Sequence, residues 1–185
     1  MTRESSLAEE RTLSSHLIYE GRALKLRIDE VEAPGGRETS REIVEHDDCV
    51  AIIAVAGDSV LLVRQFRKPV EQELLEIPAG GIDPGESPEA AVSRELREET
   101  GYLPQKVERL GGFYAVPGYG TEYLYLYLAT DLTPSRLFAE DTESISVVRV
   151  PISQILELIA SGSICDAKSI AGLLTFLEYR KQSNG

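Results

Sequence analysis

Residues 80–102, GGIDPGESPEAAVSRELREETGY, decide the fold and much of the chemistry. Glycine and proline fill the first part, which predicts a loop, and the second part has the signals of a helix over about residues 88–100. Ser87 suits the N-cap, a proline suits the first helical turn, and Gly101 is a natural stop. The stretch therefore predicts a glycine-rich loop that leads directly into a helix.

Three glutamates on this helix suggest a metal site. Glu95, Glu98 and Glu99 stand at positions i, i+3 and i+4, so their carboxylates project from one side. Ala91 and Val92 share or border that side, so it is not a plain solvent face. Neighbouring carboxylates repel one another by a few tenths of a kcal/mol per pair, and by more when partly buried, unless a cation neutralises them. Such oxygen ligands suit Mg²⁺ or Mn²⁺, although a solvated acidic helix remains an alternative because glutamate favours helices.

The segments around this stretch predict a mixed sheet that is covered on both faces by helices. Two apolar runs, CVAIIAVA and SVLLVRQF, are separated by Gly57-Asp58, which is a hairpin signal. The other expected elements are strands at residues 108–114, 122–130 and 145–150 and helices at residues 152–160 and 167–180. Residues 14–46 read as an antiparallel ribbon that turns at residues 34–36, and the first dozen residues read as a loose tail.

The charge of the chain limits its partners. It has 19 Lys+Arg and 31 Asp+Glu, a formal net charge of −12, so it would repel nucleic acids and anionic membranes. The opening MTRESSLAEERTLSS is too polar for a secretory signal, and no apolar run approaches the roughly 20 residues that span a bilayer. We therefore expect a cytoplasmic protein with no nucleic-acid or membrane partner, in which a divalent metal screens any phosphates of the substrate.

Several other catalytic motifs are missing from the sequence, namely GxxxxGK[ST], GxGxxG, GxSxG and HExxH. The histidines, His16 and His46, both fall in the ribbon. The cysteines, Cys49 and Cys165, have no CxxC spacing. Serine, cysteine and histidine–zinc chemistry therefore have little support.

The spacing around the three glutamates resembles the Nudix box, G-x5-E-x7-REU-x-EE-x-GU. Gly80 is followed after five residues by Glu86 and, after seven more, by RELREETGY, in which Tyr102 stands where an aliphatic residue is commoner. Flanking segments are similar to the ADP-ribose pyrophosphatase subgroup: VRQFRKPVEQELLEIPAGGID before the box, Pro117 at 15 positions past it (117 − 102 = 15), and ICDAKSIAGLL at residues 164–174.

This resemblance implies an α/β (α+β) fold, the Nudix α/β/α sandwich with a mixed β-sheet, plus an N-terminal antiparallel β-ribbon. It divides the chain into residues 1–46, a tail and ribbon for dimerisation and substrate binding, and residues 47–185, the Nudix hydrolase domain. The ribbon has too little apolar area to be stable alone. In the subgroup such ribbons pack across a two-fold axis, so a homodimer with shared sites is expected.

The resemblance also implies the metal ligands. Glu95 and Glu99, together with the backbone carbonyl of Ala79, are expected to bind Mg²⁺, for which Mn²⁺ can substitute. Glu98 is expected as an extra ligand, and Arg94 is expected to orient the carboxylates. Glu99 is in this way a catalytic residue as well as a ligand.

The general base of this subgroup lies outside the box, on a loop before a late strand. In this sequence that loop is residues 138–147, where Glu143 aligns best and Glu140 is second. An ordinary solvated acidic loop is the alternative interpretation.

The substrate-binding candidates come from other segments. Arg67 could clamp a phosphate, and Glu122 could accept the hydroxyls of the terminal ribose, although each could be an ordinary surface residue. Arg41 is expected to reach the partner subunit's site. Pro117, the mark of the subgroup, is a further candidate, and Glu76 is a weaker one.

The activity implied is Mg²⁺-dependent hydrolysis of ADP-ribose to AMP and ribose 5-phosphate. The alternative is hydrolysis of other nucleoside diphosphate sugars, such as GDP-mannose or UDP-glucose, because the base-contacting ribbon is too variable to interpret. Hydrolysis of oxidised nucleoside triphosphates fits Pro117 and the ribbon less well. A non-catalytic Nudix ligand sensor is disfavoured because all three glutamates are present.

Overall fold

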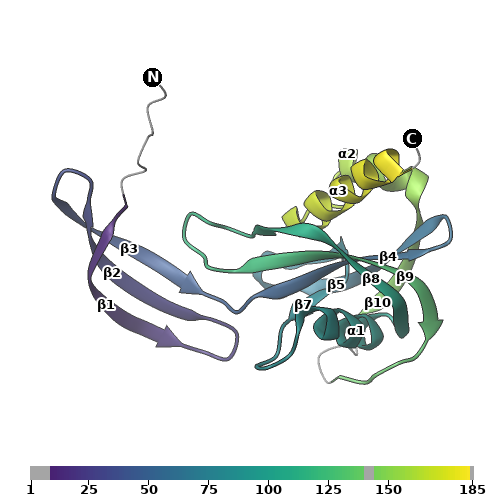
Figure 1. Cartoon of the computed structure of the whole chain (residues 1–185), viewed down its shortest axis with the longest axis horizontal. Helices are drawn as coiled ribbons and strands as arrows, with labels where there is room; N and C mark the ends of the chain where they lie inside the picture. The colour runs from purple at the N-terminus through teal and green to yellow at the C-terminus, as the bar shows by residue number, and fades with distance from the viewer. Residues whose placement is uncertain (1–8, 140–143, 184–185) are drawn as a thin grey trace. The chain divides into compact units, whose positions relative to one another are not determined.

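The computed structural model of the chain describes residues 9–139 and 144–183 (Figure 1). The chain divides into two compact units. The first contains residues 9–47 and Val116–Glu122, and the second contains Asp48–Ala115 and the described part of Tyr123–Gly185. Within the described ranges, no helix combines the length and the apolar character that crossing a membrane requires.

The first unit is built on a three-stranded antiparallel sheet in the order β1-β2-β3. Its strands are β1 (Arg11–Glu20), β2 (Lys25–Ala33) and β3 (Arg37–Glu45). The expected loose tail is wrong at residues 11 and 12, because Arg11 already pairs with Glu32 and its Nε donates to the Glu32 carboxylate at 3.1 Å. Every residue of β1 is exposed, so this strand adds backbone pairing without a buried face.

A loop from later in the chain joins this first unit. The N–H of Val44 donates to the carbonyl of Tyr119 at 2.8 Å, and the N–H of Thr121 donates to the carbonyl of Val44 at 3.1 Å. These bonds attach residues 116–122 to the end of β3. Sequence patterns give no sign of this pairing, because the two segments are more than 70 residues apart.

The second unit is organised around a mixed sheet, as the sequence predicts. Its strands are β4 (Cys49–Ala56), β5 (Ser59–Arg67), β6 (Gln72–Glu76), β7 (Ala79–Gly81), β8 (Tyr102–Tyr114), β9 (Tyr123–Pro134) and β10 (Ser146–Pro151). The main order is β10-β5-β4-β9-β8, while β6 pairs with β5 and β7 pairs with β4. Strands β4 and β9 are parallel, and the other pairs are antiparallel.

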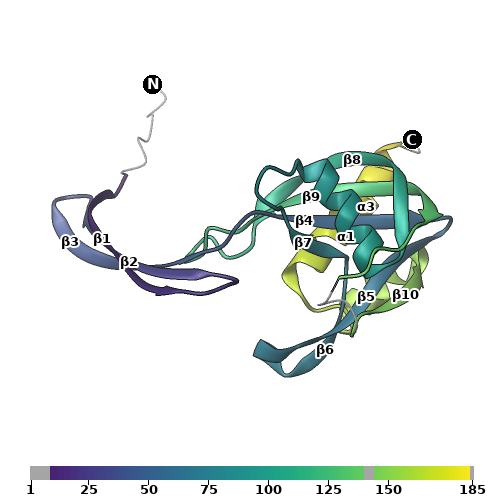
Figure 2. The ribbon, with the colours of Figure 1, turned by 90° about the horizontal axis from the view of Figure 1, so that it is seen from below.

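Helices cover both faces of this sheet, which confirms the α/β/α sandwich. They are α1 (Pro88–Glu99), α2 (Ile155–Ala160) and α3 (Ala167–Ser183). In β4 the even-numbered side chains from Val50 to Ala54 pack with α1, whereas Cys49, Ala51 and Ile53 pack with α2 and α3. Figure 2 shows α1 and α3 on opposite sides of the sheet. The continuous apolar run of β4 is therefore a strand that is buried on two faces.

The ends of α1 follow from local chemistry. The Oγ of Ser87 accepts a hydrogen bond from the N–H of Ala90 at 3.2 Å, which satisfies one of the free donors of the first turn. Gly101 has φ +81°, a left-handed conformation that ends the helix at little cost for glycine.

Other element ends differ from the sequence-based expectation. Strand β8 begins at Tyr102 rather than near residue 108, because its first residues pair with β9 as far as Pro134. The expected helix over residues 152–160 begins with a 3₁₀ turn, Ile152–Gln154, before α2. In both cases the pairing or packing partner is distant in sequence.

Candidate active site

The carboxylates of α1 lie against the loop that precedes the helix. Glu95 and Glu99 are buried, which is rare for glutamate unless a partner or an ion compensates its charge. The loop meets Glu95 at Gly80, where an added Cβ would overlap the Glu95 carboxyl group. Only glycine therefore lets the loop backbone approach this carboxylate so closely.

Arg94 connects the helix to the loop. Its Nη1 donates to Glu95 Oε1 at 2.6 Å and to Glu98 Oε2 at 3.4 Å. Its Nη2 donates to Glu86 Oε2 and to the carbonyl of Gly81, each at 2.8 Å. A planar guanidinium with five N–H donors can hold several acceptors at once, so Arg94 fixes two α1 carboxylates relative to the loop.

Burial makes the two inner carboxylates unusually basic. Burial and the neighbouring Glu95 carboxylate raise the pKa of Glu99 to about 8, although the Ala79 N–H, which donates to Glu99 Oε2 at 3.2 Å, opposes this. Burial also raises the pKa of Glu95, by more than the Arg94 guanidinium lowers it. In the absence of a bound cation, the pair therefore tends to retain a proton near neutral pH.

The donor set of this site fits a divalent cation. It offers the carboxylates of Glu95, Glu98 and Glu99, and the adjoining loop offers the carbonyl of Ala79. These are hard oxygen ligands of the kind that Mg²⁺ and Mn²⁺ select. A cation would remove the repulsion and burial cost that raise the two pKa values, which gives the buried pair a physical reason to exist.

Arg67 and Glu76 form a bidentate ion pair beside this site. Arg67 Nε donates to Glu76 Oε1 at 3.0 Å, and Arg67 Nη2 donates to Glu76 Oε2 at 2.5 Å. Glu76 is only 2% exposed. Burial opposes its ionisation, but hydrogen bonds and charges from Arg67 and Lys168 hold its pKa below the usual value. The guanidinium expected at a substrate phosphate is thus already held by an internal carboxylate.

Sequence reasoning missed the third member of this group, Lys168 at the start of α3. Its Nζ donates to Glu76 Oε2 at 2.6 Å and to Asp166 Oδ1 at 2.9 Å. Its neighbour Ser169 is fully buried and accepts a hydrogen bond from the N–H of Ile77 at 2.8 Å. A lysine in the first turn of a helix opposes the helix dipole, and that was the one available signal that it has an acidic partner.

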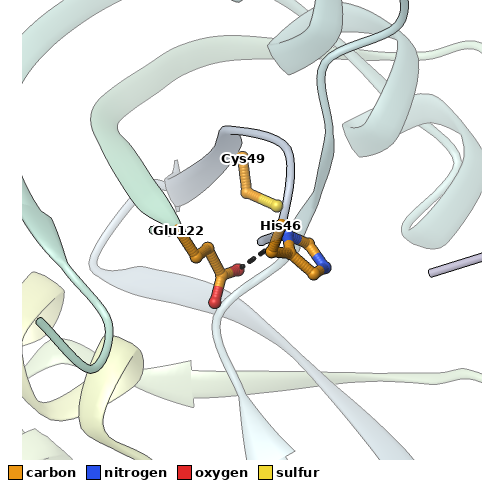
Figure 3. Close-up of side chains that lie close together, drawn as sticks. All are labelled: His46, Cys49 and Glu122. Atoms are coloured by element: carbon orange, nitrogen blue, oxygen red, sulfur yellow. Dashed lines mark ion pairs between the residues drawn. The ribbon is translucent and has the colours of Figure 1, made fainter. Parts of the chain in front are cut away.

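Three candidate substrate-binding residues, Glu122, Arg41 and Pro117, belong to the first unit and have contacts within it. Glu122 Oε1 lies 3.9 Å from His46 Nδ1 (Figure 3). Arg41 Nε donates to Glu10 Oε2 at 3.0 Å. Pro117 belongs to the 116–122 loop, where Val116 accepts hydrogen bonds from residues 119 and 120.

The structure thus groups Arg67, Glu76, Ala79, Glu95, Glu98 and Glu99 in the second unit, whereas Arg41, Pro117 and Glu122 belong to the first. The two candidates for the general base, Glu140 and Glu143, lie outside the described residues.

Comparisons with known proteins relate this chain to a family and to individual relatives. Residues 45–172 match the family model described as NUDIX domain. An ADP-ribose pyrophosphatase from Bacillus subtilis is 37% identical over 176 residues, which are 94% of this chain and 95% of that protein. A methanol dehydrogenase activator from Bacillus methanolicus is 37% identical over 167 residues, 89% of this chain and 90% of that protein. A crystal structure of an ADP compounds hydrolase superposes with a TM-score of 0.89 at 25% identity, covering 96% of this chain and 97% of the other.

Proposed function

The chain belongs to the NUDIX domain family, and from that premise we propose that it is an ADP-ribose pyrophosphatase, which hydrolyses ADP-ribose to AMP and ribose 5-phosphate with Mg²⁺. The observation that carries the proposal is the buried Glu95–Glu99 pair beside the loop at Ala79 and Gly80. Such a pair suits a cation that screens a diphosphate. The similarity to an ADP-ribose pyrophosphatase over 94% of the chain supports this choice of substrate.

The metal site consists of Glu95, Glu99 and the Ala79 carbonyl, with Glu98 as an extra ligand. When bound, Mg²⁺ supplies charge screening for the diphosphate and acidifies a water molecule. Arg94 keeps the carboxylates of Glu95 and Glu98 in place, and the Ala79 N–H orients Glu99. Mn²⁺ is expected to substitute, because it accepts the same ligands.

The reaction consumes one water. The oxygen of the water forms a new bond to one phosphorus while the bond from that phosphorus to the bridging oxygen breaks. Glu143 is the proposed general base that accepts the proton of the water, and Glu140 is the second candidate. Removal of this proton makes the water a better nucleophile at the moment of attack.

Substrate binding is assigned to five further residues. Arg67 is proposed to contact a phosphate with the donors that Glu76 leaves available, and Glu76 is proposed to hold Arg67 in place. Glu122, in the loop that begins at Pro117, is proposed to bind hydroxyls of the terminal ribose. Arg41 is proposed to reach the nucleotide in the site of a partner subunit.

The proposed assembly is a homodimer that forms through residues 1–46, with residues 47–185 as the hydrolase domain. The exposed apolar side chains of β1 support it, because Leu17, Ile18 and Tyr19 each have more than half of their surface exposed in the single chain. We propose a cytoplasmic location as well; Cys49 and Cys165 are not joined in a disulfide, which suits a reducing compartment.

The experiment is a panel of ADP-ribose, GDP-mannose and UDP-glucose with Mg²⁺, with the products identified by chromatography. We expect ADP-ribose to give AMP and ribose 5-phosphate at the highest kcat/KM, and excess EDTA to abolish turnover until Mg²⁺ or Mn²⁺ is restored. Faster turnover of another nucleotide sugar would change the assigned substrate but leave the proposed hydrolysis reaction unchanged. Undiminished activity in EDTA would reject the metal site.

A further inference from the structure

The last helix of the chain, α3, is attached to the segment that leads into the metal site. This segment runs from Glu76, at the end of β6, to Ala79, at the start of β7. Lys168 binds the Glu76 carboxylate, and Ser169 accepts a hydrogen bond from the N–H of Ile77. Two consecutive residues of α3 therefore contact two consecutive residues of the segment.

A third contact fixes how closely the helix approaches. Gly172, one turn after Ser169, packs against Ile77: an added Cβ at position 172 would lie 2.9 Å from Ile77 Cδ1 and 3.0 Å from Leu126 Cδ1. The helix backbone thus lies against a fully buried side chain of the segment. A tightly packed interior transmits displacements rather than absorbing them.

The charge arrangement explains why Lys168 occupies this position. Glu76 is buried, and Asp166 contacts the same Lys168 ammonium. Without that ammonium, Glu76 and Asp166 would lose the cation that they share. Arg67 would then be left to compensate the charge of Glu76. A buried carboxylate is stable only when its charge is compensated and its oxygens accept hydrogen bonds. The segment would therefore have to move to let water reach Glu76.

Such a movement at Glu76 would affect the proposed metal ligands, because Ala79 is only three positions further along the chain. The carbonyl of Pro78 accepts a hydrogen bond from the N–H of Ile52 at 2.8 Å. The next residue, Ala79, donates its N–H to Glu99 Oε2 and presents the carbonyl assigned to the metal. A displacement at Glu76 or Ile77 therefore changes the position of one proposed ligand and the orientation of another.

We propose that Lys168 and Ser169 are positioning residues, through which α3 holds residues 76–79 in the geometry that binds the divalent metal. In this proposal both residues act through the segment and neither is assigned as a ligand of the metal or of the substrate. This inference rests on the proposed function for the identity of the metal ligands.

The test compares Lys168→Met with Lys168→Arg and with a matched control. Methionine keeps most of the length of lysine but removes its charge, whereas arginine restores a cationic donor. The control is Lys181→Met, on the same helix, where an exposed lysine pairs with Glu178 at 3.1 Å. Ser169→Ala is a second variant that leaves the Lys168 charge in place, in case Lys168→Met does not fold.

Three measurements are made on each protein: Mn²⁺ affinity without substrate, from the electron paramagnetic resonance of free Mn²⁺; kcat and KM for ADP-ribose at saturating Mg²⁺; and the melting temperature. We expect Lys168→Met to bind Mn²⁺ about 10-fold to 100-fold more weakly, the range typical for residues that orient metal ligands. Ser169→Ala should weaken binding in the same direction. Lys168→Arg should recover most of the affinity, and Lys181→Met should match the wild type.

A folded Lys168→Met protein with a lower melting temperature but wild-type Mn²⁺ affinity and kcat would overturn the inference, because α3 would then only stabilise the fold. The proposed function would fail on its own if wild-type protein bound Mn²⁺ but did not hydrolyse ADP-ribose. In that case the comparison of Mn²⁺ affinity between the wild type and the variants would still test the positioning role. Wild-type protein that binds no Mn²⁺ would overturn both.

Discussion

Replacing Glu99 with glutamine should stabilise the metal-free protein at alkaline pH while it abolishes most activity. Glutamine has nearly the same shape and can still accept the hydrogen bond from the N–H of Ala79, but it has no charge to bury. Burial and Glu95 raise the pKa of Glu99 from 4.5 to about 8. The folded protein therefore holds this proton more tightly than the unfolded chain does.

The sign and size of the effect follow from linkage. Below about pH 4.5 the carboxyl is protonated in both states and contributes nothing to the pH dependence. Between about pH 4.5 and pH 8 the unfolded chain loses the proton while the folded protein still holds it, so stability falls. Above about pH 8 the folded protein loses the proton as well, and the loss of stability levels off. At about 1.4 kcal/mol for each step of one in pKa, the full loss has an upper limit of about 5 kcal/mol.

The assay is thermal unfolding in EDTA from pH 5 to pH 9, for wild-type protein, Glu99→Gln, and Glu157→Gln as a control at an exposed glutamate of α2. If only about 1 kcal/mol of this upper limit appears as a difference in the free energy of unfolding, the melting temperature of Glu99→Gln at high pH should exceed that of the wild type by about 2–4 °C. At pH 5 the difference should be several-fold smaller. Excess Mg²⁺ should then stabilise the wild type more than the variant.

Turnover should move the opposite way, with kcat reduced about 10²-fold or more through lost transition-state charge stabilisation. If the stability of metal-free wild type and Glu99→Gln keeps the same difference from pH 5 to pH 9, then Glu99 is not the buried, basic carboxyl that the structure describes. A variant with near-wild-type kcat would remove Glu99 from the metal site.

Three further predictions concern the base, the assembly and the loop. Glu143→Gln should lower kcat by about 10²–10⁴ with a smaller change in Mn²⁺ affinity, whereas a near-wild-type Glu143→Gln beside an inactive Glu140→Gln would reassign the base. Arg41→Ala subunits mixed with Glu99→Gln subunits should regain part of the activity, because one site of the heterodimer carries neither lesion; a monomeric mass by light scattering, or no recovery despite subunit exchange, would contradict shared sites. Gly80→Ala should weaken Mn²⁺ binding in calorimetry while remaining folded by circular dichroism, since its Cβ would displace the Glu95 carboxyl group; unchanged binding would show that the loop or the Glu95 side chain can shift without affecting the metal.

What the sequence predicted correctly was mainly local. Helix α1 begins and ends where Ser87 and Gly101 indicate, because a cap and a left-handed glycine act within one turn. The two-faced burial of β4 follows from an apolar run too short for a membrane and bounded by a hairpin signal. The spacing of Glu95 and Glu99 fixes their shared side of the helix for the same reason.

What the sequence could not predict depends on residues that meet only in the folded chain. Strand β1 extends to Arg11 because Glu32 lies opposite it, and the 116–122 loop joins the first unit because it pairs with Val44. Arg67 looked like a phosphate ligand, but the structure adds Glu76, which already accepts two of its hydrogen bonds. Lys168 could not be linked to the site at all, because its partner is 92 residues away.

The separation of 92 positions between Glu76 and Lys168 also imposes an order on biosynthesis. A ribosome completes the loop and α1 at Tyr102, and then needs 66 more residues (168 − 102 = 66) before Lys168 is made. At about 5–20 residues per second, this delay is about 3–13 seconds. During that interval the chain lacks Lys168 and Ser169, which contact Glu76 and Ile77 in the folded protein. A nascent chain thus contains its acidic helix well before α3 is made, and a chain terminated upstream of Asp166 would keep all three glutamates but lack the residues proposed to hold residues 76–79.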